Sequence, residues 1–82
     1  MGILRVLSAR AGDEQTSWDT TAAGAGDAEA LAAVREAESI FAATQARGAL
    51  AVKISADLPP ERIERFDPTA DQIILIPRVV GG

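Results

Sequence analysis

The sequence predicts an α+β domain in which one helix packs across one face of a four- to five-stranded mixed β-sheet. One long segment, residues 28–47, has apolar residues at helical spacing. Shorter runs rich in isoleucine, valine and leucine precede and follow it, as strands do. With 82 residues, the chain can bury one small core and has no room for a second domain.

The N-terminal segment predicts a β-hairpin. Residues 3–7 are apolar on both faces apart from Arg5, which is typical of a strand near the middle of a sheet. A Gly-Asp pair at residues 12–13 follows where the chain is expected to reverse. Residues 14–19 then alternate, so we expect a second strand with Trp18 directed inward.

Residues 20–26 are small, and we expect a linker there. Gly24-Ala25-Gly26 does not fit a phosphate-binding loop, because the third glycine of a dinucleotide fingerprint would fall at Glu29 and the Lys-Ser/Thr of a P-loop is absent.

Residues 28–47 predict the one long helix. Asp27 is the expected N-cap, and Glu29 lies in the first turn, where the helix dipole favours an anion. Arg47 and Gly48 are residues that commonly end a helix. The stripe expected to pack on the sheet consists of Leu31, Val34, Ala37, Ile40, Phe41 and Thr44.

Residues 49–55 predict a half-exposed strand, because their side chains alternate with period two. One face carries Leu50, Val52 and Ile54, and the other carries Lys53 and Ser55. Residues 57–61, which include two prolines, are then expected to interrupt the regular secondary structure. Residues 62–66 offer a short extended piece or a single turn with Ile63 and Phe66 directed inward.

Residues 72–76 are the most strongly β-forming stretch and predict a strand buried on both faces. Pro77 cannot donate a ladder hydrogen bond, so pairing should end there. We expect the first and last strands side by side and parallel at the centre, with residues 14–19 and 49–55 at the two edges. Residues 1–76 would then form the domain and residues 77–82 a flexible tail.

Composition excludes several kinds of site. The chain has no cysteine and no histidine, which removes disulfides, the usual transition-metal ligands and His- or Cys-dependent nucleophiles. We therefore expect neither a metal site nor an enzyme. The net charge of −4 disfavours nucleic acid and anionic lipid and favours a protein partner with a basic surface. No segment has the length of a membrane span or the character of a signal peptide, and the absence of cysteine fits a reducing cytosol. We therefore expect a soluble cytoplasmic protein, and we also expect a monomer.

The C-terminal stretch carries the most specific pattern. Asp71 is followed by the apolar residues 73–76, by Pro77 and by Arg-Val-Val-Gly-Gly at residues 78–82. In this ending and in its order of elements, the chain resembles the ubiquitin-like β-grasp superfamily. The ending is similar to those of molybdopterin-synthase small subunits, thiamine-pathway sulfur carriers and small bacterial ubiquitin-like modifiers. The stretches Trp18-Asp19 and Phe66-Asp67-Pro68 also resemble those bacterial proteins.

The resemblance implies that the chemistry takes place at the chain end. In these relatives an activating enzyme uses ATP to adenylate the terminal carboxylate, here that of Gly82, and the small protein itself binds no cofactor. Gly81 and Gly82 have no side chains, so they fit a confined active site. In such relatives the exposed sheet face and the stem are recognised together. The corresponding residues here are Ala51, Lys53, Arg78, Val79 and Val80.

The leading prediction is a protein modifier, and two alternatives remain open at this point. A protein modifier would be joined through Gly82 to a target amine, with a conjugating enzyme as a further partner. A sulfur carrier would form a Gly82 thiocarboxylate. A β-grasp binding module would not use its glycines. Arg78 favours the modifier and Pro77 the carrier, and the presence of a single lysine, Lys53, favours attachment of a modifier as a single unit.

Overall fold

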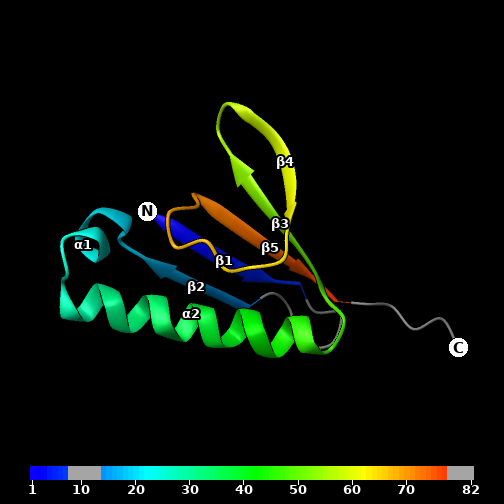
Figure 1. The fold of residues 1–82 in the computed structure, drawn as a ribbon, viewed down its shortest axis with the longest axis horizontal. Helices are drawn as coiled ribbons and strands as arrows, with labels where there is room; N and C mark the ends of the chain where they lie inside the picture. The colour runs from blue at the N-terminus through cyan, green and yellow to red at the C-terminus, as the bar shows by residue number, and fades with distance from the viewer. Residues whose placement is uncertain (8–13, 78–82) are drawn as a thin grey trace, which may run out of the picture.

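The structure is a computed structural model that describes residues 1–7 and 14–77. The elements within these residues are β1 (Gly2–Val6), β2 (Glu14–Trp18), α1 (Thr20–Gly24), α2 (Ala28–Ala46), β3 (Leu50–Ser55), β4 (Leu58–Ile63) and β5 (Gln72–Ile76). In this part of the chain the strands form one five-stranded mixed sheet, and α2 crosses one face of it (Figure 1). The predicted α+β fold class, with its β-grasp-like arrangement, is confirmed.

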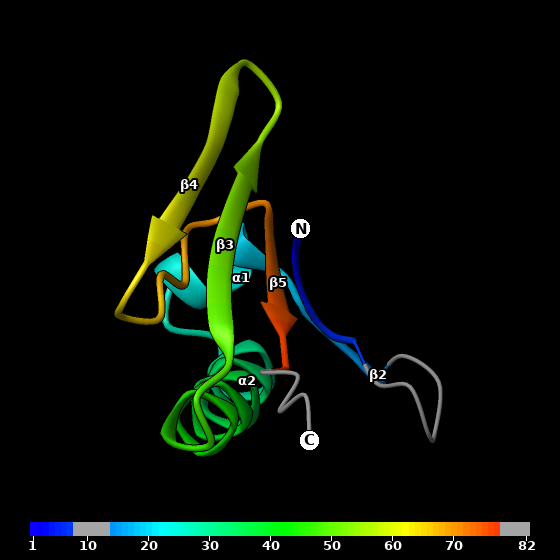
Figure 2. The same cartoon turned by 90° about the vertical axis from the view of Figure 1, so that its right-hand side faces the viewer.

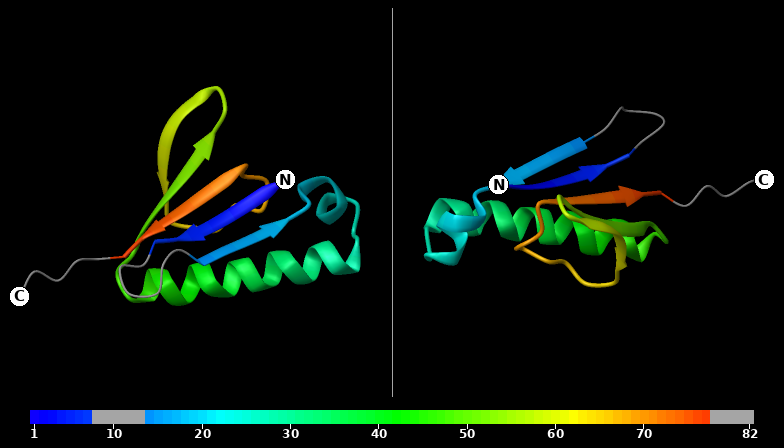
Figure 3. Two further views of the ribbon diagram at one scale, coloured as in Figure 1. Left: turned by 180° about the vertical axis from the view of Figure 1, so that it is seen from behind. Right: turned by 90° about the horizontal axis from the view of Figure 1, so that it is seen from above.

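The strand order in the sheet is β2-β1-β5-β3-β4. β1 and β5 are parallel, with Leu4 opposite Ile73 and Val6 opposite Leu75. The other neighbouring pairs are antiparallel. The first and last strands are therefore neighbours, as predicted, and the last strand lies in the middle of the sheet (Figure 3).

Trp18 connects β2 to distant parts of the chain. It is 3% exposed, and its indole N–H donates a hydrogen bond of 2.9 Å to the Pro68 carbonyl. Its ring lies 5.3 Å from the ring of Phe66. Gly2 lies opposite Trp18, and a Cβ atom there would come within 2.3 Å of the indole. The predicted inward direction of Trp18 is confirmed, and it requires glycine at residue 2.

The linker predicted for residues 20–26 contains the short helix α1. Asp19 is its N-cap, because the carboxylate accepts hydrogen bonds of 3.0 Å from the backbone N–H groups of Thr21 and Ala22. Gly26 then takes a positive φ of 87°, which suits glycine at a reversal. The cap at Asp19 outweighs the weak helix preference of the threonines that follow it.

The boundaries of α2 follow its capping residues. The Asp27 carboxylate accepts a hydrogen bond of 2.9 Å from the Ala30 N–H, so the predicted N-cap is confirmed. At the other end Arg47 is the C-cap, and Gly48 has a φ of 93°, as expected for a glycine that ends a helix.

The stripe of α2 that faces the sheet differs in part from the prediction. Its buried residues are Ala30, Val34, Ala37 and Phe41, whereas Leu31 is 37% exposed. Leu31 lies about 100° around the helix from Ala30, at the margin of the buried stripe. The prediction placed Leu31 in the core because it is large and apolar, but small alanines occupy two of the central positions.

The face of β3 that packs toward α2 is not the face with the larger apolar side chains. The period-two alternation is confirmed, but Ala51 is the residue in the core at 2% exposure, opposite Leu75 of β5. The placement of Ala51 on an exposed sheet face is therefore wrong. Lys53 shares this helix-side face, opposite the fully buried Ile73. The larger side chains Leu50, Val52 and Ile54 lie on the face away from α2.

β4 continues the sheet beyond β3, so β3 is not the edge strand that we predicted. The prolines at residues 59 and 60 are accommodated there, because an edge strand leaves one side of its backbone unpaired. The hairpin of β3 and β4 extends away from the body of the domain (Figure 2). The inward packing of Ile63 and Phe66 is confirmed, since both are partly buried against the core.

β5 is fully buried on one face only. Ile73 and Leu75 are 0% exposed beneath α2, whereas Ile76 is 39% exposed and Ile74 is half-buried. The predicted burial of both faces is therefore wrong. Pairing ends at Ile76, opposite Leu50, and Pro77 is exposed outside the strand, as predicted.

Candidate functional site

The residues on which the predicted chemistry depends follow β5 directly. Gly81 and Gly82, with Arg78, Val79 and Val80, lie outside the residues that the structure describes. The last described residue, Pro77, is exposed at the end of the middle strand. Leu50 of β3 lies on one side of this strand end, and Leu7, whose N–H donates to the Leu75 carbonyl over 3.0 Å, lies on the other.

The sheet face opposite α2, here called the open face, has an apolar centre. The register of the strands places the following residues on it: Ile3, Arg5, Gln15, Ser17, Leu50, Val52, Ile54, Arg62, Gln72, Ile74 and Ile76. Ile74 is central, because it lies between Arg5 of β1 and Val52 of β3. Its aliphatic neighbours on β3 and β5 are mostly half-buried.

The charge of the open face differs from that of the whole chain. Arg5 and Arg62 lie on it, and none of its strand residues within residues 1–7 and 14–77 is acidic. Glu14 and Glu61 belong to the helix side, since they pair with Val6 and Lys53. The net charge of −4 therefore does not describe the surface that adjoins the end of β5.

Lys53 occupies a separate position on the helix side of the sheet. Its ammonium nitrogen lies 3.2 Å from an Asp67 carboxylate oxygen and 3.6 Å from a Glu61 oxygen. The hydrogen bond to Asp67 is the main cause that raises the pKa of Lys53 above 10.5. Hydrogen bonds from Thr69, and then from Lys53, hold the pKa of Asp67 below 3.8. Lys53 is therefore not part of the open face.

The segment Phe66-Asp67-Pro68 has a packing role in this chain. Phe66 lies between Trp18 and Phe41, with ring centroids 5.3 and 5.8 Å apart respectively. Pro68 accepts the indole hydrogen bond of Trp18. Asp67 accepts hydrogen bonds from the Thr69 N–H at 2.9 Å and from its hydroxyl at 2.6 Å. These contacts hold the loop between β4 and β5 against the core.

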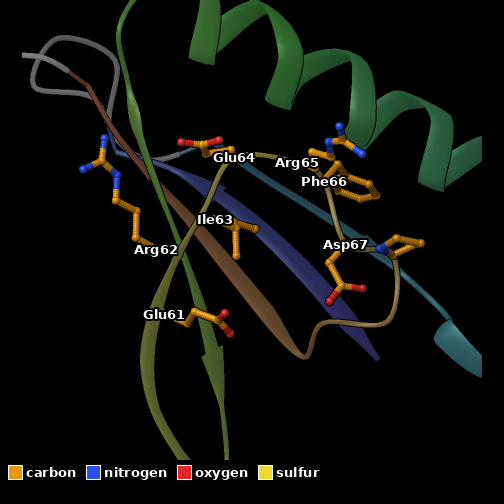
Figure 4. A pocket seen from close by; sticks show the side chains of 8 residues that line it. Glu61, Arg62, Ile63, Glu64, Arg65, Phe66 and Asp67 are labelled. Carbon is orange, nitrogen blue, oxygen red and sulfur yellow. The ribbon is translucent and has the colours of Figure 1, made fainter.

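A shallow surface depression runs along the same segment, from Glu61 to Pro68 (Figure 4). Arg65 and Phe66 lie toward α2, whereas Arg62 points away from them (Figure 4). Acidic and basic side chains alternate along it without converging on one point. Among the described residues no group of three or more carboxylate, thiol or imidazole side chains could hold a metal ion.

Sequence reasoning missed two features of these surfaces. The exposed sheet face was assigned to Ala51 and Lys53 instead of residues 50, 52 and 54, because the large apolar side chains at these three positions suggested a core face. The pairing of Lys53 with Asp67 joins residues 14 positions apart, and the Asp-Pro-Thr turn was its only local signal. The open face and the Lys53–Asp67 pair both depend on how α2 and the loop after β4 pack against the sheet.

No protein-family model, curated protein or solved structure matches this chain. Within residues 1–7 and 14–77, no helix is both long enough and apolar enough to cross a membrane.

Proposed function

We propose that this chain is a ubiquitin-like protein modifier. A separate activating enzyme would adenylate its Gly82 carboxylate, and the acyl group would then pass to a target amine. The observation that carries the proposal is the position of β5. This middle strand stops at Ile76, and an exposed Pro77 follows it, directly before the Arg-Val-Val-Gly-Gly sequence.

The chemistry requires nothing catalytic from the domain. A Gly82 carboxylate oxygen attacks the α-phosphorus of ATP, which releases pyrophosphate and gives an acyl adenylate. The target amine then attacks the acyl carbon, either in the adenylate itself or after the acyl group has passed to an enzyme cysteine. A C–N bond forms, the bond to the leaving group breaks, and the amine loses a proton to solvent. The glycines at residues 81 and 82 allow close approach, because they carry no side chain.

The open face supplies a recognition surface next to the end of β5. Its apolar centre around Ile74 and Val52 gains from burial against an apolar partner surface. Arg5 and Arg62 favour acidic groups at the rim of that partner. We assign this face, together with Arg78, Val79 and Val80, to recognition by the activating enzyme.

A sulfur carrier is the second candidate, because the exposed Pro77 directly after β5 resembles the ending of such carriers. It shares the adenylation step but ends in a Gly82 thiocarboxylate, with sulfur in place of one carboxylate oxygen. The two functions differ in the product that the native host makes, so one experiment separates them.

The test is to express an N-terminally tagged chain in its native host and to purify it under denaturing conditions. Trypsin cleaves after Arg78 and leaves Val-Val-Gly-Gly on any target lysine, and mass spectrometry locates this remnant. We expect remnants on lysines of other proteins. A thiocarboxylate without remnants would establish the carrier instead.

The matched control is the chain without Gly82. Within residues 1–7 and 14–77, the core residues lie between Leu4 and Leu75. We therefore expect this deletion to leave the thermal unfolding midpoint unchanged while it abolishes the remnant. If the full chain gives no remnant on any target and carries no thiocarboxylate, activation is contradicted and a binding module is favoured.

A further inference from the structure

The only lysine of the chain, Lys53, lies in a cluster of carboxylates that the fold assembles from two segments. Glu61 comes from β4, directly opposite Lys53 in the sheet, and Asp67 comes from the loop that follows. The side chain of Lys53 is 24% exposed. Its ammonium group has both carboxylates within 3.6 Å.

The position of Asp67 is fixed by contacts that do not involve Lys53. One carboxylate oxygen accepts hydrogen bonds from the backbone and hydroxyl of Thr69, which leaves the other oxygen for Lys53. The next residue, Pro68, is held by the indole N–H of Trp18. The hydrogen bonds of this turn therefore hold Asp67 beside the amine of Lys53.

This arrangement matters because acylation requires an unprotonated amine. The nitrogen lone pair attacks the acyl carbon, a C–N bond forms, and the bond from carbon to the leaving group breaks. Hydrogen bonds to carboxylates stabilise the ammonium form, in which a proton occupies that lone pair. They also direct the amine toward the protein, and both effects lower its reactivity.

We propose that Asp67 and Glu61 protect Lys53 from acylation, so that the chain is a poor acceptor for its own activated carboxyl group. The biological meaning of this protection rests on the proposed function. Since Lys53 is the only lysine, lysine-linked polymers of this chain would have to pass through it. Protection of this one amine directs attachment toward lysines of other proteins.

The first test measures the reactivity of Lys53 directly in the folded full chain. Sulfosuccinimidyl acetate at a limiting concentration acetylates free amines, and fragmentation of the intact protein locates each acetyl group. An Arg62→Lys variant supplies a matched amine, because Arg62 is exposed on the same hairpin and its guanidinium has no ion pair within residues 1–7 and 14–77. We expect the introduced amine to react about two- to fivefold faster than Lys53, the effect of a partly exposed ion pair. Equal rates would overturn the proposal.

Removal of each carboxylate provides the second test. Asp67→Asn should raise the acetylation rate of Lys53 toward that of the matched amine, and Glu61→Gln should raise it less, because Glu61 is farther away. Glu61 is exposed on an edge strand, so its variant tests the proposal even if Asp67→Asn unfolds. Circular dichroism shows which variants are folded. An unchanged rate in both folded variants, or in Glu61→Gln alone if only it folds, would contradict protection by these carboxylates.

The acetylation assay does not use an activating enzyme, so it separates this proposal from the proposed function. Slow acetylation of Lys53 would establish protection even if Gly82 is never activated. In the native host, we expect no Val-Val-Gly-Gly remnant on Lys53 of the wild-type chain. A remnant at Lys53 at the level of other targets would confirm activation of Gly82 and refute protection.

Discussion

At the scale of single residues, the contacts of Trp18 explain which residues occupy several distant positions, and the apolar pattern of the sequence does not explain them. Its indole fills the space above Gly2, where any side chain would collide. It also packs on Phe66 and holds Pro68 by a hydrogen bond. The inward direction of Trp18 could be predicted from the alternation of its strand. The need for glycine at residue 2 could not, because it arises from a cross-strand contact.

We predict that Gly2→Ala destabilises the domain by about 1–3 kcal/mol, the usual cost of overpacking a core. The added Cβ would lie 2.3 Å from the indole, so the ring or the strand must shift. Chemical denaturation followed by tryptophan fluorescence measures the change. Gly24→Ala is the control, because a Cβ at Gly24 meets nothing within 4 Å. An equal effect of the two substitutions would contradict this description of the Trp18 contact.

The pair of Lys53 and Asp67 predicts how stability changes with pH. The pKa of Asp67 lies below its usual 3.8, so its contribution is present above about pH 4 and is lost as the pH falls through the lower folded value. The pKa of Lys53 lies above 10.5, so its contribution is present below about pH 10 and is lost as the pH rises past the folded value.

We therefore expect the wild-type chain to exceed Asp67→Asn in free energy of unfolding by a constant amount between about pH 5 and 10. This difference should shrink at both extremes. Urea denaturation of both proteins over a pH series provides the measurement. A difference that persists at pH 2 would show that Asp67 acts through something other than its charge.

At the scale of elements, local signals predicted those parts of the fold that depend on neighbouring residues. The limits of α2 followed from Asp27 and Gly48, and the end of β5 followed from Pro77. The faces of β3 could not be predicted in this way. The side facing α2 carries Ala51, a small residue in a core that also contains Ala37, while the larger Val52 lies outside. Only the packing of the helix on the sheet decides which face is buried.

Because Ala37 is 0% exposed, we predict that Ala37→Leu lowers the free energy of unfolding by about 1–3 kcal/mol. Ala42→Leu is the matched control, since Ala42 is exposed on the same helix and leucine is a good helix former. Thermal and urea unfolding of both variants measure the effect. If Ala37→Leu were as stable as Ala42→Leu, the buried stripe assigned to α2 would be wrong.

At the scale of the whole molecule, element order was sufficient to predict the fold class and the pairing of β1 with β5. The candidate site was predicted from the chain end alone, through Gly81 and Gly82, and these residues lie outside the described part. A recognition face beside that end was predicted, but it was assigned to Ala51 and Lys53, which lie on the opposite side of the sheet. Net charge gave no indication of the basic character of the open face, because only the sheet register places Arg5 and Arg62 on the same face.

We predict that Arg62→Glu slows activation of the chain by about tenfold at low salt, because it reverses a charge on the proposed recognition surface. The effect should diminish as salt screens it. Arg35→Glu on the exposed side of α2 is the control and should have little effect. ATP-dependent loading in host extract, followed by intact mass, measures both. Equal slowing by the two substitutions would exclude a specific role for the open face.

Trapping of the activated carboxyl group tests the central claim most directly. The full chain is incubated with native host extract, ATP and hydroxylamine, which attacks an acyl adenylate or thioester at its carbonyl carbon and gives a hydroxamate. We predict an ATP-dependent hydroxamate that fragmentation places at Gly82, whether the chain serves as modifier or carrier. The absence of any ATP-dependent mass change, or the same change in a chain without Gly82, would contradict activation of this carboxylate.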